Sequence, residues 1–141
     1  MKYKYIWFDL GKTLVEVNRS KVYQNVLEKL DIHLGETEIK KAYHFTDKLF
    51  MRDYPHVLGS PKENYLPWYL GNLNFLLDIQ VDILKVYQLL EEEWQTRGRK
   101  WTLIPGTLEL LENLQQKGIK TGLISNWDSS CREVLKANGL L

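Results

Sequence analysis

Two short apolar runs, far apart in the chain and each ended by a polar residue, constrain the fold more than any other feature. The first is Tyr5-Ile6-Trp7-Phe8, followed by Asp9, and the second runs from Ile119 to Ile124, followed by Ser125. Apolar runs that lack clean alternation with polar residues are typical of strands buried on both faces, and such strands usually belong to parallel sheets. The sequence therefore predicts an α/β fold with two buried parallel strands.

The chain between these runs is expected to be helical. Apolar side chains recur there at helical spacing in four segments, which start at Ser20, at Thr37, at the capping box and proline of Ser60-Pro61-Lys62-Glu63, and at Ile83. Two further helices are predicted after the capping residues Thr107 and Ser130. We therefore expect a core of residues 1–18 and 99–141, interrupted by a four-helix insertion over residues 19–98.

Composition and charge exclude several classes of protein. Hydrophobic residues make up 44% and charged residues 26% of the 141 residues, so intrinsic disorder is not the whole account. The 19 basic and 18 acidic residues give a net charge of +1, which provides no field to attract nucleic acid or an anionic membrane. No apolar stretch approaches the roughly 20 residues of a membrane span, and the single Cys131 favours a reducing compartment. We expect a soluble, cytoplasmic protein.

Asp9 is the first candidate site residue, because open α/β sheets bind ligands outside the carboxyl ends of their strands. On position alone, an aspartate there is equally a turn-forming residue that caps the loop after a strand. Ser125 has a similar position, and a serine after a strand is also a common cap of the following loop. Position by itself leaves the binding and the structural interpretations open for both residues.

The ordered motifs of nearly the whole chain resemble those of the haloacid dehalogenase superfamily. In that family an apolar strand is followed by Asp-x-Asp-Gly-Thr-Leu, which Asp9, Thr13 and Leu14 match, and a second apolar strand ends in Ser or Thr, which Ser125 matches. The segment from about Arg19 to Gly98 lies where the family inserts its helical cap domain. The resemblance implies a Rossmann-like parallel-sheet core with an inserted α-helical bundle cap.

The resemblance also implies a chemistry, in which an aspartate attacks phosphorus, or carbon in some branches, and water hydrolyses the covalent aspartyl intermediate. It assigns the nucleophile to Asp9, and it assigns the ligands of Mg²⁺ to the Asp9 carboxylate and the backbone carbonyl of Gly11. Phosphate-binding candidates are the Ser125 hydroxyl, Asn126 and Lys12. The implied substrate is a small phosphorylated metabolite.

The chain departs from the family pattern at two places. Family phosphatases carry a second aspartate two positions after the nucleophile, which protonates the leaving group and then activates water; here Gly11 occupies that position, and Lys12 stands where glycine is usual. Such an acid/base group contributes about 10²–10⁴-fold, so efficient phosphatase action is in question. Dehalogenases of the superfamily also lack this aspartate, so both chemistries stay open. No residue matches the lysine and the acidic residues of the family's later motifs.

Two strand candidates are too few for a parallel sheet covered on both faces. We therefore expect the chain to be the N-terminal part of a longer hydrolase, with completion of the sheet by a second copy as the alternative.

Two other functions stay open. A degenerate, non-catalytic member of the family that binds a phosphorylated ligand or a protein partner is favoured by Gly11 and by the missing later motifs. A receiver-type phosphoacceptor domain also uses an aspartate at one strand end and a hydroxyl residue at another. The long helical insertion soon after Asp9 argues against a receiver, because receivers alternate strand and helix closely.

Overall fold

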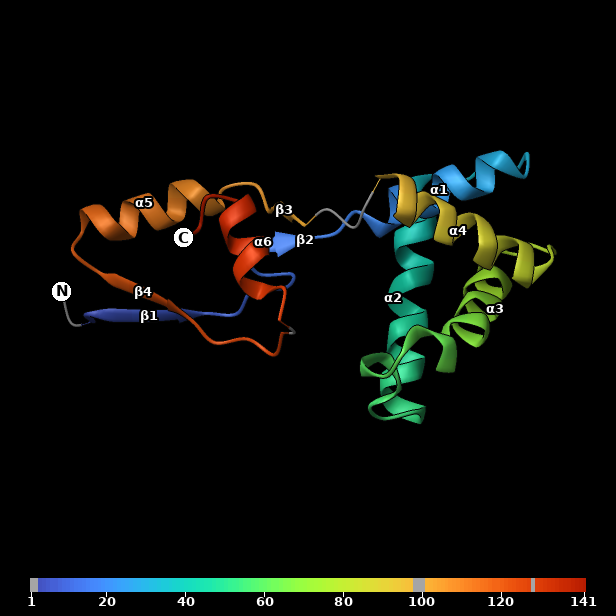
Figure 1. Cartoon of the computed structure of the whole chain (residues 1–141), viewed down its shortest axis with the longest axis horizontal. Helices are drawn as coiled ribbons and strands as arrows, with labels where there is room; N and C mark the ends of the chain where they lie inside the picture. The colour runs from blue at the N-terminus through green and yellow to red at the C-terminus, as the bar shows by residue number, and fades with distance from the viewer. Residues whose placement is uncertain (1–2, 98–100, 128) are drawn as a thin grey trace. The chain divides into compact units, whose positions relative to one another are not determined.

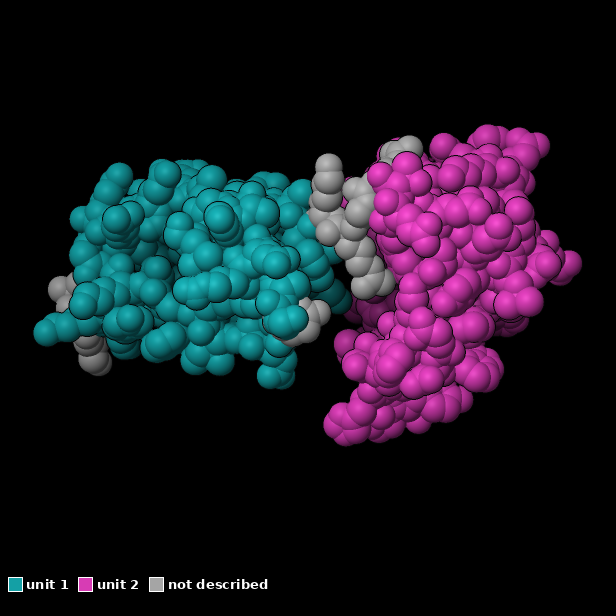
Figure 2. All heavy atoms as spheres, viewed as in Figure 1, with its two compact units in different colours: residues 1–17, 99–141 teal, residues 18–98 magenta. Residues whose placement is uncertain are grey.

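The computed structural model describes residues 3–97, 101–127 and 129–141. The chain divides into two compact units, of which one combines Met1–Val17 with Arg99–Leu141 and the other is Asn18–Gly98 (Figure 2). The discontinuous unit contains the strands of the described chain, and the continuous unit is helical. No helix in the described ranges is long and apolar enough to cross a membrane.

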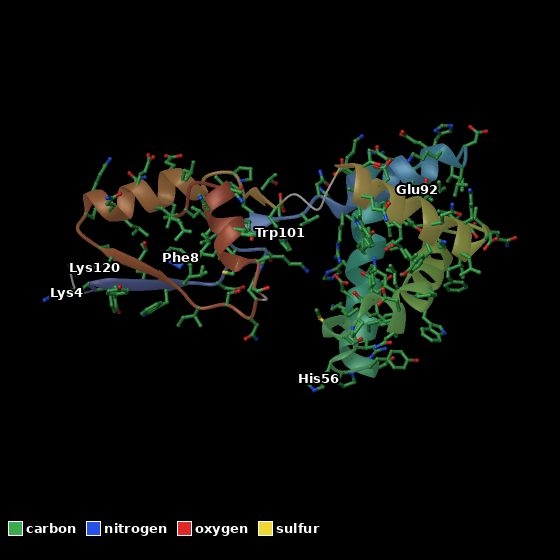
Figure 3. The ribbon with its side chains drawn as sticks, in the orientation of Figure 1. Lys4, Phe8, His56, Glu92, Trp101 and Lys120 are labelled. Carbon is green, nitrogen blue, oxygen red and sulfur yellow. The ribbon has the colours of Figure 1, made fainter. Side chains whose placement is uncertain are left out.

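The strands β1 (Tyr5–Phe8) and β4 (Lys120–Leu123) pair in parallel, which confirms the predicted α/β arrangement. Their register places Tyr5 opposite Lys120 and Phe8 opposite Leu123. The pairing extends at both ends, because the Lys120 amide donates to the Lys4 carbonyl at 3.0 Å and the Ile124 amide donates to the Phe8 carbonyl at 2.8 Å. In Figure 3, Lys4 and Lys120 lie together at the amino ends of the two strands. The residues that follow both strands therefore lie at one edge of the sheet.

One face of β1 is exposed, so the prediction that this strand is buried on both faces is wrong. Tyr5 and Trp7 are 48% and 58% exposed, whereas Ile6 and Phe8 are half-buried. Successive side chains of a strand point to opposite faces. The helices α5 (Thr107–Gln116) and α6 (Cys131–Ala137) lie on one side of the β1–β4 pair (Figure 1), which leaves the Tyr5 and Trp7 face without a covering layer in the described part of the chain.

Trp7 lies across Gly122, its partner in the parallel register. A Cβ atom added at Gly122 would be 2.3 Å from Cζ3 of the Trp7 ring, well inside van der Waals contact. The Trp7 ring also stacks on Tyr5 with a centroid separation of 5.1 Å. Glycine at position 122 thus leaves the space that the Trp7 indole occupies beside the neighbouring strand.

Two further strands, β2 (Val15–Glu16) and β3 (Thr102–Leu103), form an antiparallel pair that the sequence analysis did not predict. Each strand has only two residues, which is too short for any alternation of apolar and polar side chains to be recognised. The chain leaves the discontinuous unit after β2 and returns to it at β3.

The start of α5 is tied to the segment before β2. The Ile104 amide donates to the Leu14 carbonyl at 2.9 Å, and the buried Thr107 hydroxyl donates to the same carbonyl at 3.2 Å. The N-cap position is held by Gly106, with φ 86°, and not by Thr107 as predicted, because the Thr107 side chain is engaged by Leu14.

The helical unit contains the four expected helices: α1 (Arg19–Lys29), α2 (Glu36–Asp53), α3 (Leu66–Leu76) and α4 (Ile83–Arg97). Their shared core includes Tyr23, Leu27, Ile39, Leu70 and Leu73, each with no more than 1% of its surface exposed. Burial of these side chains provides the main stabilisation of the bundle.

Three predicted helix starts in this unit differ from the structure. The difference is one residue for α2, which begins at Glu36 and not at Thr37. The Asn18 side chain, and not that of Ser20, accepts the Lys21 amide at the start of α1, because Ser20 is buried inside the first turn. The segment after Pro61 forms only the short 3₁₀ turn η2 (Lys62–Asn64), which follows another such turn, η1 (Val57–Gly59). A second proline, Pro67, opens α3.

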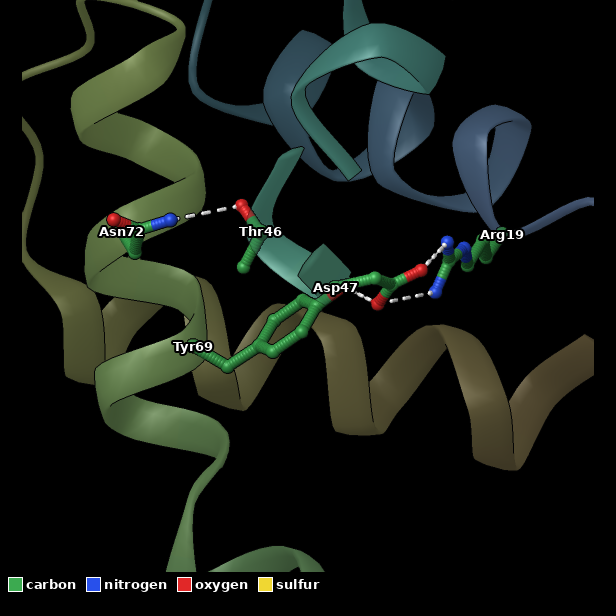
Figure 4. Close-up of polar contacts among 5 residues, drawn as sticks. All are labelled: Arg19, Thr46, Asp47, Tyr69 and Asn72. Atoms are coloured by element: carbon green, nitrogen blue, oxygen red, sulfur yellow. Dashed lines mark hydrogen bonds and ion pairs between the residues drawn. The ribbon is translucent and has the colours of Figure 1, made fainter. Parts of the chain in front are cut away.

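A polar cluster links three helices of this unit (Figure 4). The carboxylate of Asp47 on α2 accepts hydrogen bonds from Arg19 at 2.5 and 3.3 Å and from the Tyr69 hydroxyl at 2.5 Å. Nearby, the Asn72 amide donates to the Thr46 hydroxyl at 3.0 Å. Burial raises the pKa of Tyr69, and its hydrogen bond to Asp47 raises that pKa further. Because Arg19 is the first residue of α1, this cluster fixes the point at which the chain enters the helical unit.

Candidate functional site

A cavity of about 510 Å³ lies at the carboxyl edge of the β1–β4 pair. The residues that line it come from the segments directly after the two strands: Asp9, Gly11, Ile124, Ser125, Asn126 and Trp127. The parallel register explains this convergence, since Asp9 follows Phe8, Ser125 comes two positions after Leu123, and Phe8 and Leu123 are partners. The cavity belongs entirely to the discontinuous unit.

The turn after Asp9 is held by the hydrophobic core beneath it. The Leu10 carbonyl accepts the amides of Leu14 at 2.9 Å and Val15 at 3.1 Å. Leu10, Leu14 and Val15 are all buried, and together they form the centre of the core of this unit. Asp9 itself is exposed. The buried Leu10, Leu14 and Val15 thus anchor the backbone of this turn, while Asp9 stays accessible to solvent.

Lys12 stands apart from the other predicted site residues. The described lining of the cavity does not include it, and its side chain is exposed. Its backbone is left-handed, with φ 61°, a conformation that glycine adopts without the steric cost that other residues incur. The structure thus supplies a physical reason why glycine suits this position, while a phosphate-binding role for Lys12 stays a prediction.

Trp127 lines the cavity and was not identified as a site residue from the sequence. Its ring lies against the backbone of Gly11, so that a Cβ atom added at Gly11 would be 3.1 Å from Cζ3 of the indole. The Trp127 Nε1–H donates to the Ser130 hydroxyl at 3.2 Å, and the ring meets Trp101 edge to face with centroids 4.6 Å apart. The one available signal was a large aromatic residue in the loop directly after Ser125 and Asn126.

The predicted capping role of Ser130 is absent, because its backbone is helical, with φ −78° and ψ −7°, and not extended as in a capping residue. The Ser130 side chain makes no capping hydrogen bond at the start of α6, and its hydroxyl accepts the indole N–H. Ser130 therefore positions a residue of the cavity wall.

The cavity offers one ionisable side chain among its described lining residues, the carboxylate of Asp9. The hydroxyl of Ser125 and the amide of Asn126 add neutral hydrogen-bond donors, and Ile124 and Trp127 add apolar surface. A carboxylate is a nucleophile, and neutral donors nearby suit the oxygens of a tetrahedral anion. The arrangement is therefore suited to a covalent reaction at Asp9 or to binding of an anion with a cation.

The donor chemistry of this site fits Mg²⁺. The Asp9 carboxylate and the backbone of Gly11 line the same cavity, and carboxylate and carbonyl oxygens are ligands that Mg²⁺ prefers. Within the described ranges, no group of three or more His, Cys, Asp or Glu side chains is placed to hold a metal ion. A site with so few protein ligands suits a cation that keeps several waters and takes further oxygens from a phosphorylated substrate.

A family model described as haloacid dehalogenase-like hydrolase matches residues 3–140. No curated protein matches the chain significantly.

Solved structures with the same fold include a HAD family hydrolase from Deinococcus radiodurans R1 with bound phosphate and sodium (23% identity, TM-score 0.61, covering 98% of this chain and 53% of that one). A hydrolase from Streptococcus pneumoniae TIGR4 is 21% identical with a TM-score of 0.57, covering 99% of this chain and 63% of that one. A Bacillus subtilis protein named as the HAD-hydrolase YfnB, bound to magnesium, is 21% identical with a TM-score of 0.51, covering 100% of this chain and 62% of that one. The chain thus spans less than two thirds of each of these proteins.

Proposed function

Because this chain belongs to the haloacid dehalogenase-like hydrolases, we propose that it acts in the hydrolysis of a small phosphorylated molecule, with Asp9 as the nucleophile. The observation that carries the proposal is that Asp9 and Ser125, at the ends of neighbouring parallel strands, line one cavity. The phosphate bound to the Deinococcus radiodurans hydrolase, which has the same fold, also supports it.

The proposed reaction has two displacement steps. In the first, an Asp9 carboxylate oxygen bonds to phosphorus while the bond from phosphorus to the leaving oxygen breaks. In the second, a water oxygen bonds to phosphorus and releases a proton to solvent, while the bond from phosphorus to the Asp9 oxygen breaks and its electron pair restores the carboxylate. The Ser125 hydroxyl and the Asn126 amide would donate hydrogen bonds to the phosphoryl oxygens and so hold the group in place during both steps.

We propose Mg²⁺ as the cofactor, held by the Asp9 carboxylate and the Gly11 carbonyl. When bound, this cation neutralises charge on the phosphoryl oxygens and lowers their repulsion of the attacking carboxylate. The magnesium bound to the Bacillus subtilis protein supports this assignment. We also propose a cytoplasmic location, because a single cysteine, Cys131, suits a reducing compartment.

The proposal is tested by hydrolysis of acetyl phosphate in the presence of Mg²⁺. We expect Asp9→Asn to reduce the rate to the uncatalysed level and Ser125→Ala to lower it by about 10²-fold, the usual effect of losing one donor to a developing charge. Glu109→Gln, an exposed position on α5, is the matched control and should leave the rate unchanged. Equal turnover by the wild-type protein and Asp9→Asn would reject the proposal.

A second candidate function is binding of a phosphorylated ligand without turnover. It is favoured by one observation, that Asp9 is the one ionisable side chain in the described lining of the cavity. Calorimetry with Mg²⁺ and beryllofluoride, a mimic of an acyl phosphate, separates the two candidates. Uptake that depends on Asp9, together with no hydrolysis of acetyl phosphate, would favour binding alone.

A further inference from the structure

We propose that Trp127 occupies the space of an acid/base side chain beside Asp9, and that it thereby restricts this site to substrates whose leaving group departs without being protonated. Acyl phosphates and phosphate esters of acidic phenols are substrates of this class. The inference rests on the proposed function and narrows its substrate.

The first argument is steric. A Cβ atom at position 11 would be 3.1 Å from Cζ3 and 3.9 Å from Cη2 of the Trp127 ring. Ordinary contact between two carbon atoms is about 3.5–4.0 Å, so a Cβ atom at position 11 fits only if the indole gives way by a few tenths of an ångström. Gly11 and Trp127 both line the cavity with Asp9, so the occupied space lies within the site itself.

The second argument is that the indole is held on several sides. Its Nε1–H donates to Ser130, and its ring meets Trp101 at an interplanar angle of 61°. The Trp101 carbonyl accepts the Asn138 amide at 3.1 Å, which anchors that neighbour to the end of α6. Both indoles pack on the core formed by Leu10, Leu14 and Val15. These contacts oppose a displacement of the Trp127 ring.

The third argument concerns protons. Asp9 is the attacking group and cannot also protonate the leaving oxygen. Among the other described lining residues, Ser125 and Asn126 have no proton acidic enough to transfer near neutral pH, and the Trp127 N–H is bonded to Ser130. With no such proton donor among the described lining residues, the leaving oxygen departs with the electron pair of its bond to phosphorus and takes its proton from solvent afterwards. A carboxylate or an acidic phenolate is stable in that form, whereas an alkoxide is not.

The leaving-group dependence of the rate tests this inference on the wild-type protein. We would measure kcat/KM for a series of para-substituted phenyl phosphates, which differ in the acidity of the phenol more than in size, and for glycerol phosphate. We expect kcat/KM to fall continuously as the phenol becomes less acidic, and to fall by at least about 10²-fold from 4-nitrophenyl phosphate to glycerol phosphate. A flat dependence would overturn the inference while leaving Asp9 as the nucleophile. If the wild-type protein hydrolyses none of these substrates faster than Asp9→Asn does, the proposed function and the inference are both contradicted.

A pair of variants tests the role of Trp127 directly. In Gly11→Asp alone, the indole excludes the new carboxyl, and the leaving-group dependence should stay steep. In Gly11→Asp combined with Trp127→Ala, the carboxyl has space beside Asp9, and the dependence should become shallower as the poorer substrates gain rate. If Gly11→Asp alone flattens the dependence as much as the double variant does, Trp127 does not exclude an acid. Should either variant fail to fold, the series on the wild-type protein still decides the inference.

Discussion

Lys12 adopts a left-handed backbone conformation, with φ 61°, in the turn that follows Asp9. This conformation costs a residue with a Cβ atom about 1–2 kcal/mol relative to glycine. The turn is nevertheless fixed, because the Lys12 amide donates to the Val15 carbonyl at 2.8 Å and the Leu10 carbonyl accepts the amides that follow. The strain in this turn is therefore borne by Lys12, three positions after the candidate nucleophile.

We predict that Lys12→Gly raises the free energy of unfolding by about 1 kcal/mol, because glycine relieves the strain at this position. Lys12→Ala removes the same charge but keeps a Cβ atom, and it should give no such gain. Urea unfolding of both variants and the wild-type protein measures the difference. Equal stability of the glycine and alanine variants would show that the backbone conformation is not strained.

The ends of the two strands pointed to Asp9 and Ser125, and the resemblance to the family added Gly11 and Asn126. The structure brings all four residues to one cavity. Their chemical roles stay predictions. Trp127 could not be assigned in the same way, since its contact with Gly11 joins residues from opposite ends of the chain and depends on the register of two strands.

Among the secondary-structure elements, the β1–β4 pair determines the geometry of the candidate site. Its two strands were predictable because each is a compact apolar run with a polar residue at its end. The exposure of Trp7 was not predictable, because the same run is compatible with burial on one face or on two. The pair β2–β3 and the start of α3 at Leu66 also depend on tertiary contacts and on backbone geometry that no local pattern encodes.

We predict that Gly122→Ala destabilises the β1–β4 pair by about 1 kcal/mol, because the new methyl group displaces the Trp7 ring from the neighbouring strand. In a Trp7→Ala background the same substitution should cost much less, since the space is then open. The double-mutant cycle is measured by chemical unfolding. Additive effects of the two substitutions would contradict the packing of Trp7 on Gly122.

The helical unit should lose stability in alkaline solution. Burial raises the pKa of Tyr23 and of Tyr69 well above the ordinary value of about 10 for a tyrosine. Below pH 10 both tyrosines are protonated in the folded and unfolded states, and their contribution does not depend on pH. Above pH 10 the unfolded chain releases these protons while the folded unit keeps them. The free energy of unfolding therefore falls as pH rises, with a slope that approaches about 1.4 kcal/mol per pH unit for each tyrosine.

Thermal unfolding between pH 9 and pH 11 measures this dependence. Above pH 10, Tyr69→Phe should reduce the dependence of stability on pH by the contribution of one buried tyrosine. Tyr54→Phe is the matched control, because Tyr54 is 58% exposed, and it should leave the dependence unchanged. An unchanged slope in Tyr69→Phe would contradict the burial of this hydroxyl beside Asp47.

On the scale of the whole molecule, the chain forms an α/β unit from two segments that are separated in sequence by a helical unit. A helical segment interrupts the α/β unit after β2, and the chain returns at β3, which pairs with β2. The chain belongs to a family of hydrolases, and it spans 53–63% of the solved structures described above. The sequence predicted the family because its motifs occur in the family's order, whereas no feature of the sequence specifies the substrate.

The central claim is that the Asp9 carboxylate accepts a phosphoryl group. It is tested most directly by mixing the protein with acetyl phosphate and Mg²⁺, quenching, and treating with hydroxylamine, which converts an aspartyl phosphate into a stable hydroxamate. Peptide mass spectrometry then locates the modified residue. The account predicts modification at Asp9 that is absent from Asp9→Asn; a protein that hydrolyses acetyl phosphate with no modification at Asp9, or with modification elsewhere, would contradict it.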